Sequence, residues 1–165
     1  MRTHILSRTV VKVKQALIWL TVLIGTSACS RLPPLTPQIL TEAQEKWNNH
    51  RPQSYRLVIE MSGDRVETGR FEVEVQAGHV ISLRRNGLIV PSATGEEYSM
   101  EGLFHTLVQE LGLAEKPAML GAAPGYAVYT TAKFDEMNGH LIRYRRIVGG
   151  TSNSIEIKVV KYEEN

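Results

Sequence analysis

Six short runs of the chain alternate apolar and polar residues, which is the period of a strand that buries one face. They lie at residues 54–62, 71–76, 80–85, 126–135, 141–148 and 154–162. In the first run Tyr55, Leu57 and Ile59 alternate with polar or smaller residues. Strands of a parallel sheet would instead be continuously apolar. The pattern therefore predicts an antiparallel sheet of about six strands with one solvated face.

One longer segment has the period of a helix. Ser99 can cap its start and Gly112 can end it. The apolar residues at helical spacing are Met100, Leu103, Phe104, Leu107, Val108 and Leu111. A shorter helix is predicted over residues 42–49, with Thr41 as its cap. The predicted fold class is α+β, with the antiparallel sheet packed against one major and one short helix.

Two octapeptides in the two halves of the chain resemble each other. Gly78-His79-Val80-Ile81-Ser82-Leu83-Arg84-Arg85 aligns with Gly139-His140-Leu141-Ile142-Arg143-Tyr144-Arg145-Arg146. Each half also reads as a helix followed by three strands, which indicates a tandem helix-plus-three-strand repeat. In such a repeat His79 and His140 could meet across the sheet. Chance similarity between two amphipathic strands is the alternative.

The first 28 residues have the layout of a secretion signal. Basic residues precede an apolar run at residues 16–24, and small residues then lead to Cys29. The run is too short to be a spanning helix of about 20 apolar residues. We therefore predict a signal peptide over residues 1–28. Ordinary secretion, with Cys29 left as a free thiol, is the alternative reading of this segment.

The residues around the cysteine, Thr26-Ser27-Ala28-Cys29, resemble the lipobox of bacterial lipoproteins. The resemblance implies that Cys29 becomes the mature N-terminus and carries a diacylglycerol. Ser30 then resembles the outer-membrane sorting signal of Gram-negative bacteria. Thr26 departs from the usual leucine at that position. Residues 29–40 are predicted to be a lipidated, proline-rich tether, and residues 41–165 a single α+β domain.

Removing the leader changes the charge of the chain. Without residues 1–28 the chain keeps 137 residues, with 15 basic and 17 acidic side chains. This length suits one domain with a hydrophobic core. The net charge argues against a protein that binds nucleic acid, which needs a basic face for the phosphates. With a single cysteine, no disulfide can form within the chain.

Three further segments resemble a family of small secreted or lipid-anchored bacterial domains of unknown function. They are Trp47 with Pro52-x-Ser54-Tyr55, a strand ending in Gly78-His79-Val80, and the helix start Met100-Glu101-Gly102-Leu103-Phe104. The resemblance covers residues 43–146. It implies no catalytic residues. Some members carry a cysteine pair near the first hairpin, which this chain lacks.

The chain contains none of the usual catalytic or metal-binding motifs. Its five histidines give no HExxH motif and no close pair, and neither a GxSxG elbow nor an SxxK pair occurs. Glu72 and Glu74 could mimic a glycosidase pair, but Arg56 and Arg84 nearby favour an ordinary charge ladder. We predict no cofactor, no metal and no catalytic residue, and a non-enzymatic protein is favoured.

The remaining candidate is a surface. Two apolar segments, residues 88–91 and 118–121, lie in predicted loops on either side of the second helix. They either form a rim that binds a partner or pack beneath the domain as part of its core. The proposed partner surface comprises Leu88, Ile89, Val90, Met119, Leu120, Arg84, Arg143 and Arg145. The solvated sheet face should also carry Arg56, Glu60, Glu72, Glu74, Lys133, Glu156 and Lys158.

These observations lead to one main hypothesis and two alternatives. The main hypothesis is a non-enzymatic lipoprotein of the outer membrane, facing the periplasm, that is held by its acyl chains and binds another envelope protein. One alternative is a purely structural spacer, and the other is an envelope hydrolase or carrier of a small apolar ligand. Its pocket would lie among the loops beside the second helix, near Tyr98, His105 and Tyr126.

Overall fold

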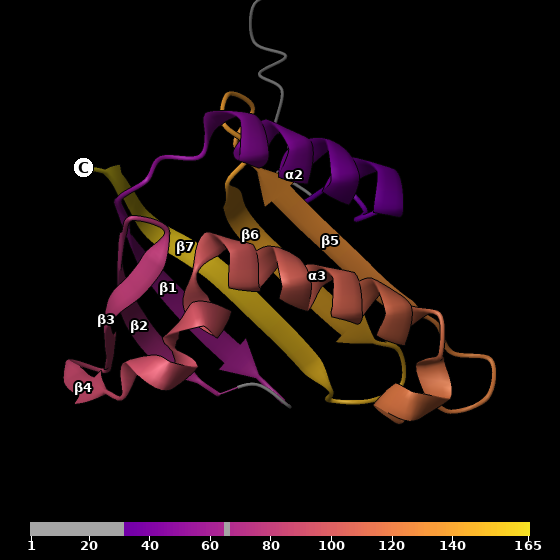
Figure 1. Cartoon of the computed structure of the whole chain (residues 1–165). Helices are drawn as coiled ribbons and strands as arrows, with labels where there is room; N and C mark the ends of the chain where they lie inside the picture. The colour runs from indigo at the N-terminus through magenta and orange to yellow at the C-terminus, as the bar shows by residue number, and fades with distance from the viewer. Residues whose placement is uncertain (1–31, 65–66) are drawn as a thin grey trace, which may run out of the picture. The chain divides into compact units, whose positions relative to one another are not determined.

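The computed structural model describes residues 32–64 and 67–165, which form one antiparallel sheet with two α-helices on one of its faces (Figure 1). The helices are α2 (Pro37–His50) and α3 (Met100–Ala114), and two 3₁₀ helices are η1 (Ser92–Tyr98) and η2 (Pro117–Leu120). The strands are β1 (Tyr55–Gly63), β2 (Gly69–Gln76), β3 (His79–Arg85), β4 (Leu88–Val90), β5 (Val128–Phe134), β6 (Leu141–Val148) and β7 (Ser154–Glu164). Cys29 and the predicted signal peptide lie outside the described residues.

The strand order is β4-β3-β2-β1-β7-β6-β5, and every neighbouring pair is antiparallel. The last strand of the chain, β7, therefore pairs with the first, β1, and joins the two halves of the sheet. The predicted α+β class with an antiparallel sheet is confirmed. The described residues form seven strands, whereas about six were predicted.

The additional strand is β4, which the sequence analysis assigned to a loop. Asn86 and Gly87 both have positive φ, 50° and 82°, as expected for a two-residue type I′ hairpin turn. This turn returns Leu88–Val90 along β3, where Leu83 faces Val90. The three-residue strand is too short to show a period of two. The Asn-Gly pair was the signal that indicated it.

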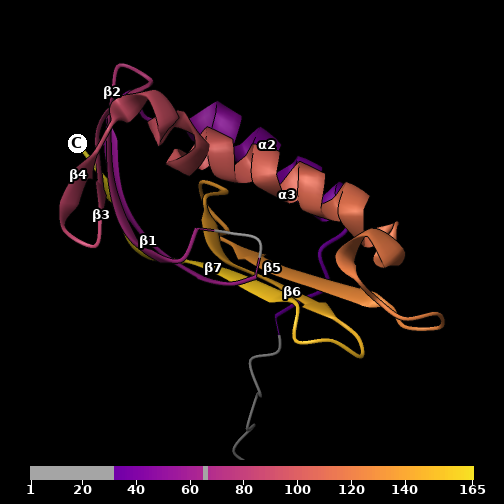
Figure 2. The same cartoon turned by 90° about the horizontal axis from the view of Figure 1, so that it is seen from below.

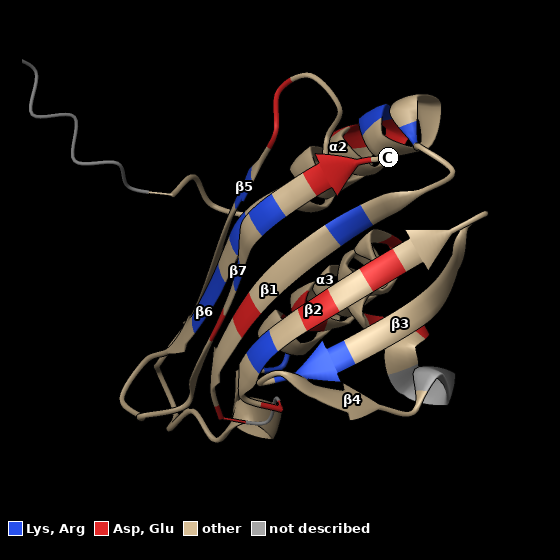
Figure 3. Ribbon diagram, turned by 90° about the vertical axis from the view of Figure 1, so that its left-hand side faces the viewer, with Lys and Arg blue, Asp and Glu red and all other residues tan. Residues whose placement is uncertain are grey.

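The hydrophobic core lies between the helices and the sheet, and both helices are on the inner side of the sheet's curve (Figure 2). Helix α2 buries Leu40, Ala43 and Trp47. The predicted stripe of α3 is correct at Met100, Leu103, Phe104 and Leu107, which are all buried. Val108, however, is 51% exposed, and Glu110 is buried in its place. The opposite face of the sheet carries the charged side chains that the alternation predicted (Figure 3).

The predicted tether is largely part of the domain. Thr36, not Thr41, caps the first helix, and Pro37 occupies its first turn, so this helix is nearly as long as α3. Residues 33–35 run along the edge of β5. The Leu35 N–H donates to the Thr130 carbonyl, and the Ala132 N–H donates to the Pro33 carbonyl. Residues 32–165 form one compact unit with its own hydrophobic core.

The two similar octapeptides form equivalent bulged hairpins. In β3 the pairing with β2 skips Ile81, and in β6 the pairing with β5 skips Ile142. However, β3 is the third strand after its helix and β6 is the second. The octapeptides therefore do not align the two predicted halves. His79 and His140 do not meet, because three strands separate β3 from β6, about 19 Å at ordinary strand spacing.

Gly139, at the end of the β5–β6 turn, allows α2 to approach the sheet closely. Its φ is +78°, and a Cβ there would lie 2.3 Å from the Ala43 carbonyl oxygen in α2. We expect Gly139→Ala to lower the free energy of unfolding by at least about 1–2 kcal/mol, because the left-handed backbone alone disfavours alanine by that amount. Thermal and urea unfolding would measure this change.

Gly112→Ala is the matched control. Gly112 lies within α3, which continues past it to Ala114, and a Cβ there would contact nothing within 4 Å. Alanine should stabilise the helix by about 0.5–1 kcal/mol. Equal effects of the two substitutions would show that α2 does not pack on Gly139 as described.

Candidate functional site: an apolar sheet edge beside a groove

Strand β4 ends the sheet and exposes apolar side chains. Leu88 is 75% exposed and Ile89 is 77% exposed. Among the described residues, only β3 pairs with β4, so the other edge of β4 presents unpaired backbone groups. Such an edge is a template for another strand, and most proteins protect it with charges, proline or a covering element. β4 is short and Pro91 follows it, but its exposed side chains, Leu88 and Ile89, are apolar.

A groove adjoins the core side of β4. Its apolar lining comes from Phe71, Leu83, Val90 and Tyr98, with Pro91 at one end. The rings of Phe71 and Tyr98 stack with centroids 4.3 Å apart and an interplanar angle of 17°. Because Leu88 and Val90 alternate with Ile89, they lie on this core side of the strand. The groove is therefore continuous with the apolar edge.

Charged side chains border the groove. The Arg85 guanidinium carbon lies 5.6 Å from the centre of the Phe71 ring, and Arg85 Nη1 lies 3.2 Å from Glu67 Oε2. The Tyr98 hydroxyl donates to the same Glu67 oxygen at 3.2 Å. Burial, followed by the charge of Glu67, raises the pKa of Tyr98 to about 12, so its hydroxyl remains a donor at neutral pH. These bonds hold the aromatic pair in place.

This arrangement can accept an extended peptide. A strand that pairs with β4 would obtain backbone hydrogen bonds from the open edge, and its alternate side chains would lie over the groove. Arg84 lies directly opposite Ile89 on the solvated face. It could contact the side chains of the added strand that point away from the groove. No acid, base or nucleophile arrangement is needed for this kind of recognition.

The structure separates the residues of the predicted partner surface into three places. Leu88, Ile89, Val90 and Arg84 lie together at the β4 edge. Met119 and Leu120 belong to η2, at the other end of α3, which is about 22 Å long. Leu120 is buried, so this second apolar segment is in part core. Arg143 and Arg145 lie on the solvated face of β6.

The residues of the predicted ligand pocket do not share one cavity. Tyr98 lines the groove beside β4. His105 is exposed on α3 and borders a different depression, together with Glu96, Glu97 and Glu101. Tyr126 is 53% exposed beside the β6–β7 turn and lines neither depression. The predicted hydrolase or carrier pocket is therefore not assembled by these three side chains.

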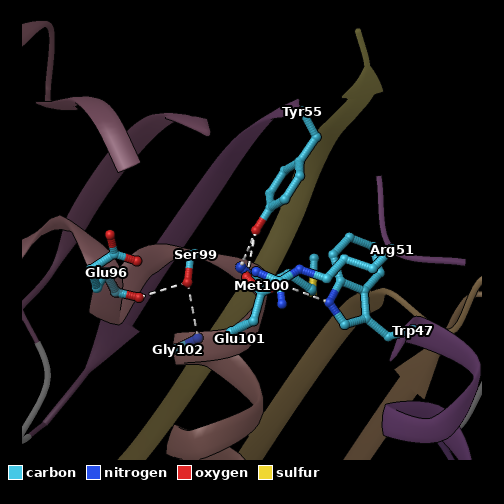
Figure 4. A network of polar contacts seen from close by, with 8 residues as sticks. All are labelled: Trp47, Arg51, Tyr55, Glu96, Ser99, Met100, Glu101 and Gly102. Atoms are coloured by element: carbon cyan, nitrogen blue, oxygen red, sulfur yellow. Dashed lines mark hydrogen bonds and ion pairs between the residues drawn. The ribbon is translucent and has the colours of Figure 1, made fainter. Parts of the chain in front are cut away.

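A polar network at the start of α3 joins three elements (Figure 4). Trp47 Nε1 donates to Glu101 Oε1 at 2.9 Å, and the Tyr55 hydroxyl donates to Glu101 Oε2 at 2.8 Å. Arg51 Nε lies 2.8 Å from the same carboxylate. The Tyr55 hydroxyl also accepts the Met100 N–H at 3.1 Å. Burial, followed by the charge of Glu101, raises the pKa of Tyr55, so the hydroxyl stays protonated and serves as a structural donor.

A second buried network explains why Glu110 replaces Val108 in the core. Arg146 is 1% exposed, and its Nη1 donates to both oxygens of Glu110, at 2.9 and 2.6 Å. The Tyr144 hydroxyl donates to Glu110 Oε2, and Arg146 Nη2 donates to Asn153 Oδ1. A buried arginine must be paired with an opposite charge. Arg146 is on another element, so the sequence pattern of the helix alone cannot predict that Glu110 is buried. Both networks hold structural elements together.

Among the described residues, no three His, Cys, Asp or Glu side chains are grouped as ligands for a metal ion. Within the same residues, no helix is long and apolar enough to cross a membrane. Comparisons of the chain with protein-family models, curated proteins and solved structures found no match. The functional argument therefore depends on the geometry of this molecule.

The Glu101 network should be a major source of stability. We expect Glu101→Ala to lower the free energy of unfolding by about 2–4 kcal/mol, because two side-chain donors lose an ionised acceptor. Unfolding can be followed by the fluorescence of Trp47, the one tryptophan outside the leader. Glu97→Ala, an exposed carboxylate in the preceding 3₁₀ helix, is the control and should change stability by less than about 0.5 kcal/mol.

Proposed function

We propose that this protein is a lipid-anchored, periplasm-facing binding module that recognises an extended segment of another envelope protein. The observation that carries the proposal is the open β4 edge, where Leu88 and Ile89 are exposed and Val90 lines an apolar groove. Addition of a strand to a sheet edge is a common mode of peptide recognition. The backbone supplies affinity and the flanking side chains supply selectivity.

The proposed location rests on the sequence. The basic and apolar leader, the residues Thr26-Ser27-Ala28-Cys29 and the serine at position 30 favour acylation of Cys29 and sorting to the outer membrane. One acyl chain gives only marginal membrane binding, whereas two or more give stable attachment. The resemblance to small secreted or lipid-anchored bacterial domains is consistent with this proposal.

A non-enzymatic role is the better proposal for this surface. The groove combines apolar walls with an arginine and a carboxylate that already bond to each other. Its tyrosine hydroxyl is a donor held by Glu67. These groups can select a partner by shape and charge, whereas a hydrolase would need an activated nucleophile or water.

The anchor can be tested by replacing the acylated residue. We expect Cys29→Ala to move the protein from the membrane fraction to the soluble fraction, because the acyl chains supply the attachment. Cell fractionation with palmitate labelling measures both steps. Ser27→Ala keeps Cys29 and a small residue before it, and it should leave both the labelling and the membrane fraction unchanged. Persistence of Cys29→Ala in the membranes in high-salt buffer would contradict the proposed anchor.

The β4 edge can be tested by site-specific photocrosslinking in cells. A photoreactive residue at Ile89 should yield a discrete adduct with an envelope protein. The substitution Leu88→Asp should reduce its yield at least about tenfold, because a carboxylate would then have to be buried in the interface.

Met137 provides the matched position. It is 83% exposed and apolar, but it lies in the β5–β6 turn, away from β4. The same photoreactive residue at Met137 should not yield that adduct. Identical products from positions 89 and 137 would contradict recognition through β4. An adduct of twice the mass of the chain would instead identify a second copy of this protein as the partner.

A further inference from the structure

The positive charge of the solvated sheet face is concentrated on three strands. Lys133 of β5 lies directly opposite Arg143 of β6, which lies directly opposite Lys158 of β7. Arg145 follows on β6, opposite Glu156. We call Lys133, Arg143, Arg145 and Lys158 the basic patch. The register sets two carboxylates beside these four cations: Glu156, bonded to Arg143, and Glu60 of β1, directly opposite Lys158.

The other half of the same face is balanced. Arg56 pairs with Glu74, and Arg70 pairs with Glu60. Figure 3 shows this difference: blue and red bands are mixed on β1 and β2, whereas blue predominates on β5 and β6. Like charges directly opposite each other in a sheet are destabilising. In the basic patch two carboxylates lie beside four cations, and one of them, Glu60, is bonded to Arg70. The patch therefore keeps an excess of positive charge, which suits an anionic surface outside the chain.

The path of the N-terminal segment indicates which surface this is. Residues 33–35 pair along the outer edge of β5, the strand that carries Lys133. Leu32 is the third residue after Cys29, and an extended chain spans at most about 3.6 Å per residue, so the two residues are at most about 11 Å apart. This maximum distance between Leu32 and Cys29 is of the same order as the Debye length at physiological salt, about 8 Å. The predicted tether over residues 29–40 would have allowed a far greater separation.

We propose that the basic patch binds the headgroups of anionic phospholipids in the membrane that holds Cys29. The proposal rests on the proposed anchor at Cys29 for its geometry. Arginine and lysine both bind phosphate, and arginine can do so with two parallel hydrogen bonds. The acyl chains thus hold the domain at the bilayer, and the patch sets which side of the domain faces it.

The test uses the chain from Ser30 onward, which lacks both the leader and the acylation site and keeps the compact unit with its own core. It is mixed with vesicles of phosphatidylcholine alone or of phosphatidylcholine and phosphatidylglycerol in equal parts, and the bound fraction is measured by sedimentation. We expect binding to the anionic vesicles only, and a decrease as the salt concentration rises.

Charge reversal identifies the patch. Lys133→Glu with Lys158→Glu should weaken binding to the anionic vesicles at least about tenfold, since each basic residue near such a surface contributes severalfold to affinity. The control, Arg84→Glu with Lys116→Glu, makes the same change in net charge at exposed positions elsewhere and should retain most of the binding. Circular dichroism checks that both variants are folded.

Two outcomes would overturn this inference. Equal loss in both double variants would mean that net charge, not the patch, attracts the protein. Absence of binding to anionic vesicles would mean that the patch serves another ligand, such as an acidic protein. Neither result bears on palmitate labelling of Cys29 or on crosslinking from Ile89, so failure here is distinguishable from failure of the proposed function.

Discussion

One carboxylate, that of Glu101, holds the two helices and the sheet together. It accepts hydrogen bonds from Trp47 of α2 and Tyr55 of β1, while Arg51 at the end of α2 pairs with it. Because Glu101 lies in the first turn of α3, where the helix dipole favours a negative charge, the network also fixes where that helix starts. Helix α3 follows directly after η1 and β4, so this network also contributes to the position of the groove beside β4.

The surfaces that remain available for other molecules lie at opposite ends of the sheet. The open apolar edge is on β4, whereas the basic patch spans β5, β6 and β7, and residues 33–35 run along β5. Six strand spacings separate β4 from β5, about 29 Å. The central strands carry balanced ion pairs and the core side carries the helices. A module built in this way could hold one edge at a membrane and present the other edge to a partner.

Part of the candidate site could be predicted from the sequence. Leu88, Ile89 and Val90 attracted notice as apolar residues outside a periodic run, but three residues are too few to show the period of a strand. The Asn86-Gly87 pair, which forms the turn before β4, was the sequence signal for this strand. For the basic patch, the alternation predicted that Lys133, Arg143, Arg145 and Lys158 all lie on the solvated face. Which of them are neighbours depends on the strand order and register, which the alternation does not show.

The sequence by itself determined the antiparallel sheet with one charged face, the helix from Ser99 and most of its buried stripe, because the periods of two and 3.6 are local properties of the chain. Only the tertiary structure decided that β7 joins β1, that Glu110 is buried beside Arg146 while Val108 is exposed, and that residues 33–35 run along β5. Each of these depends on a partner far away in sequence. A local pattern specifies which side chains share a face. A buried charge or an open sheet edge also needs a partner, and the chain supplies that partner only when it is folded.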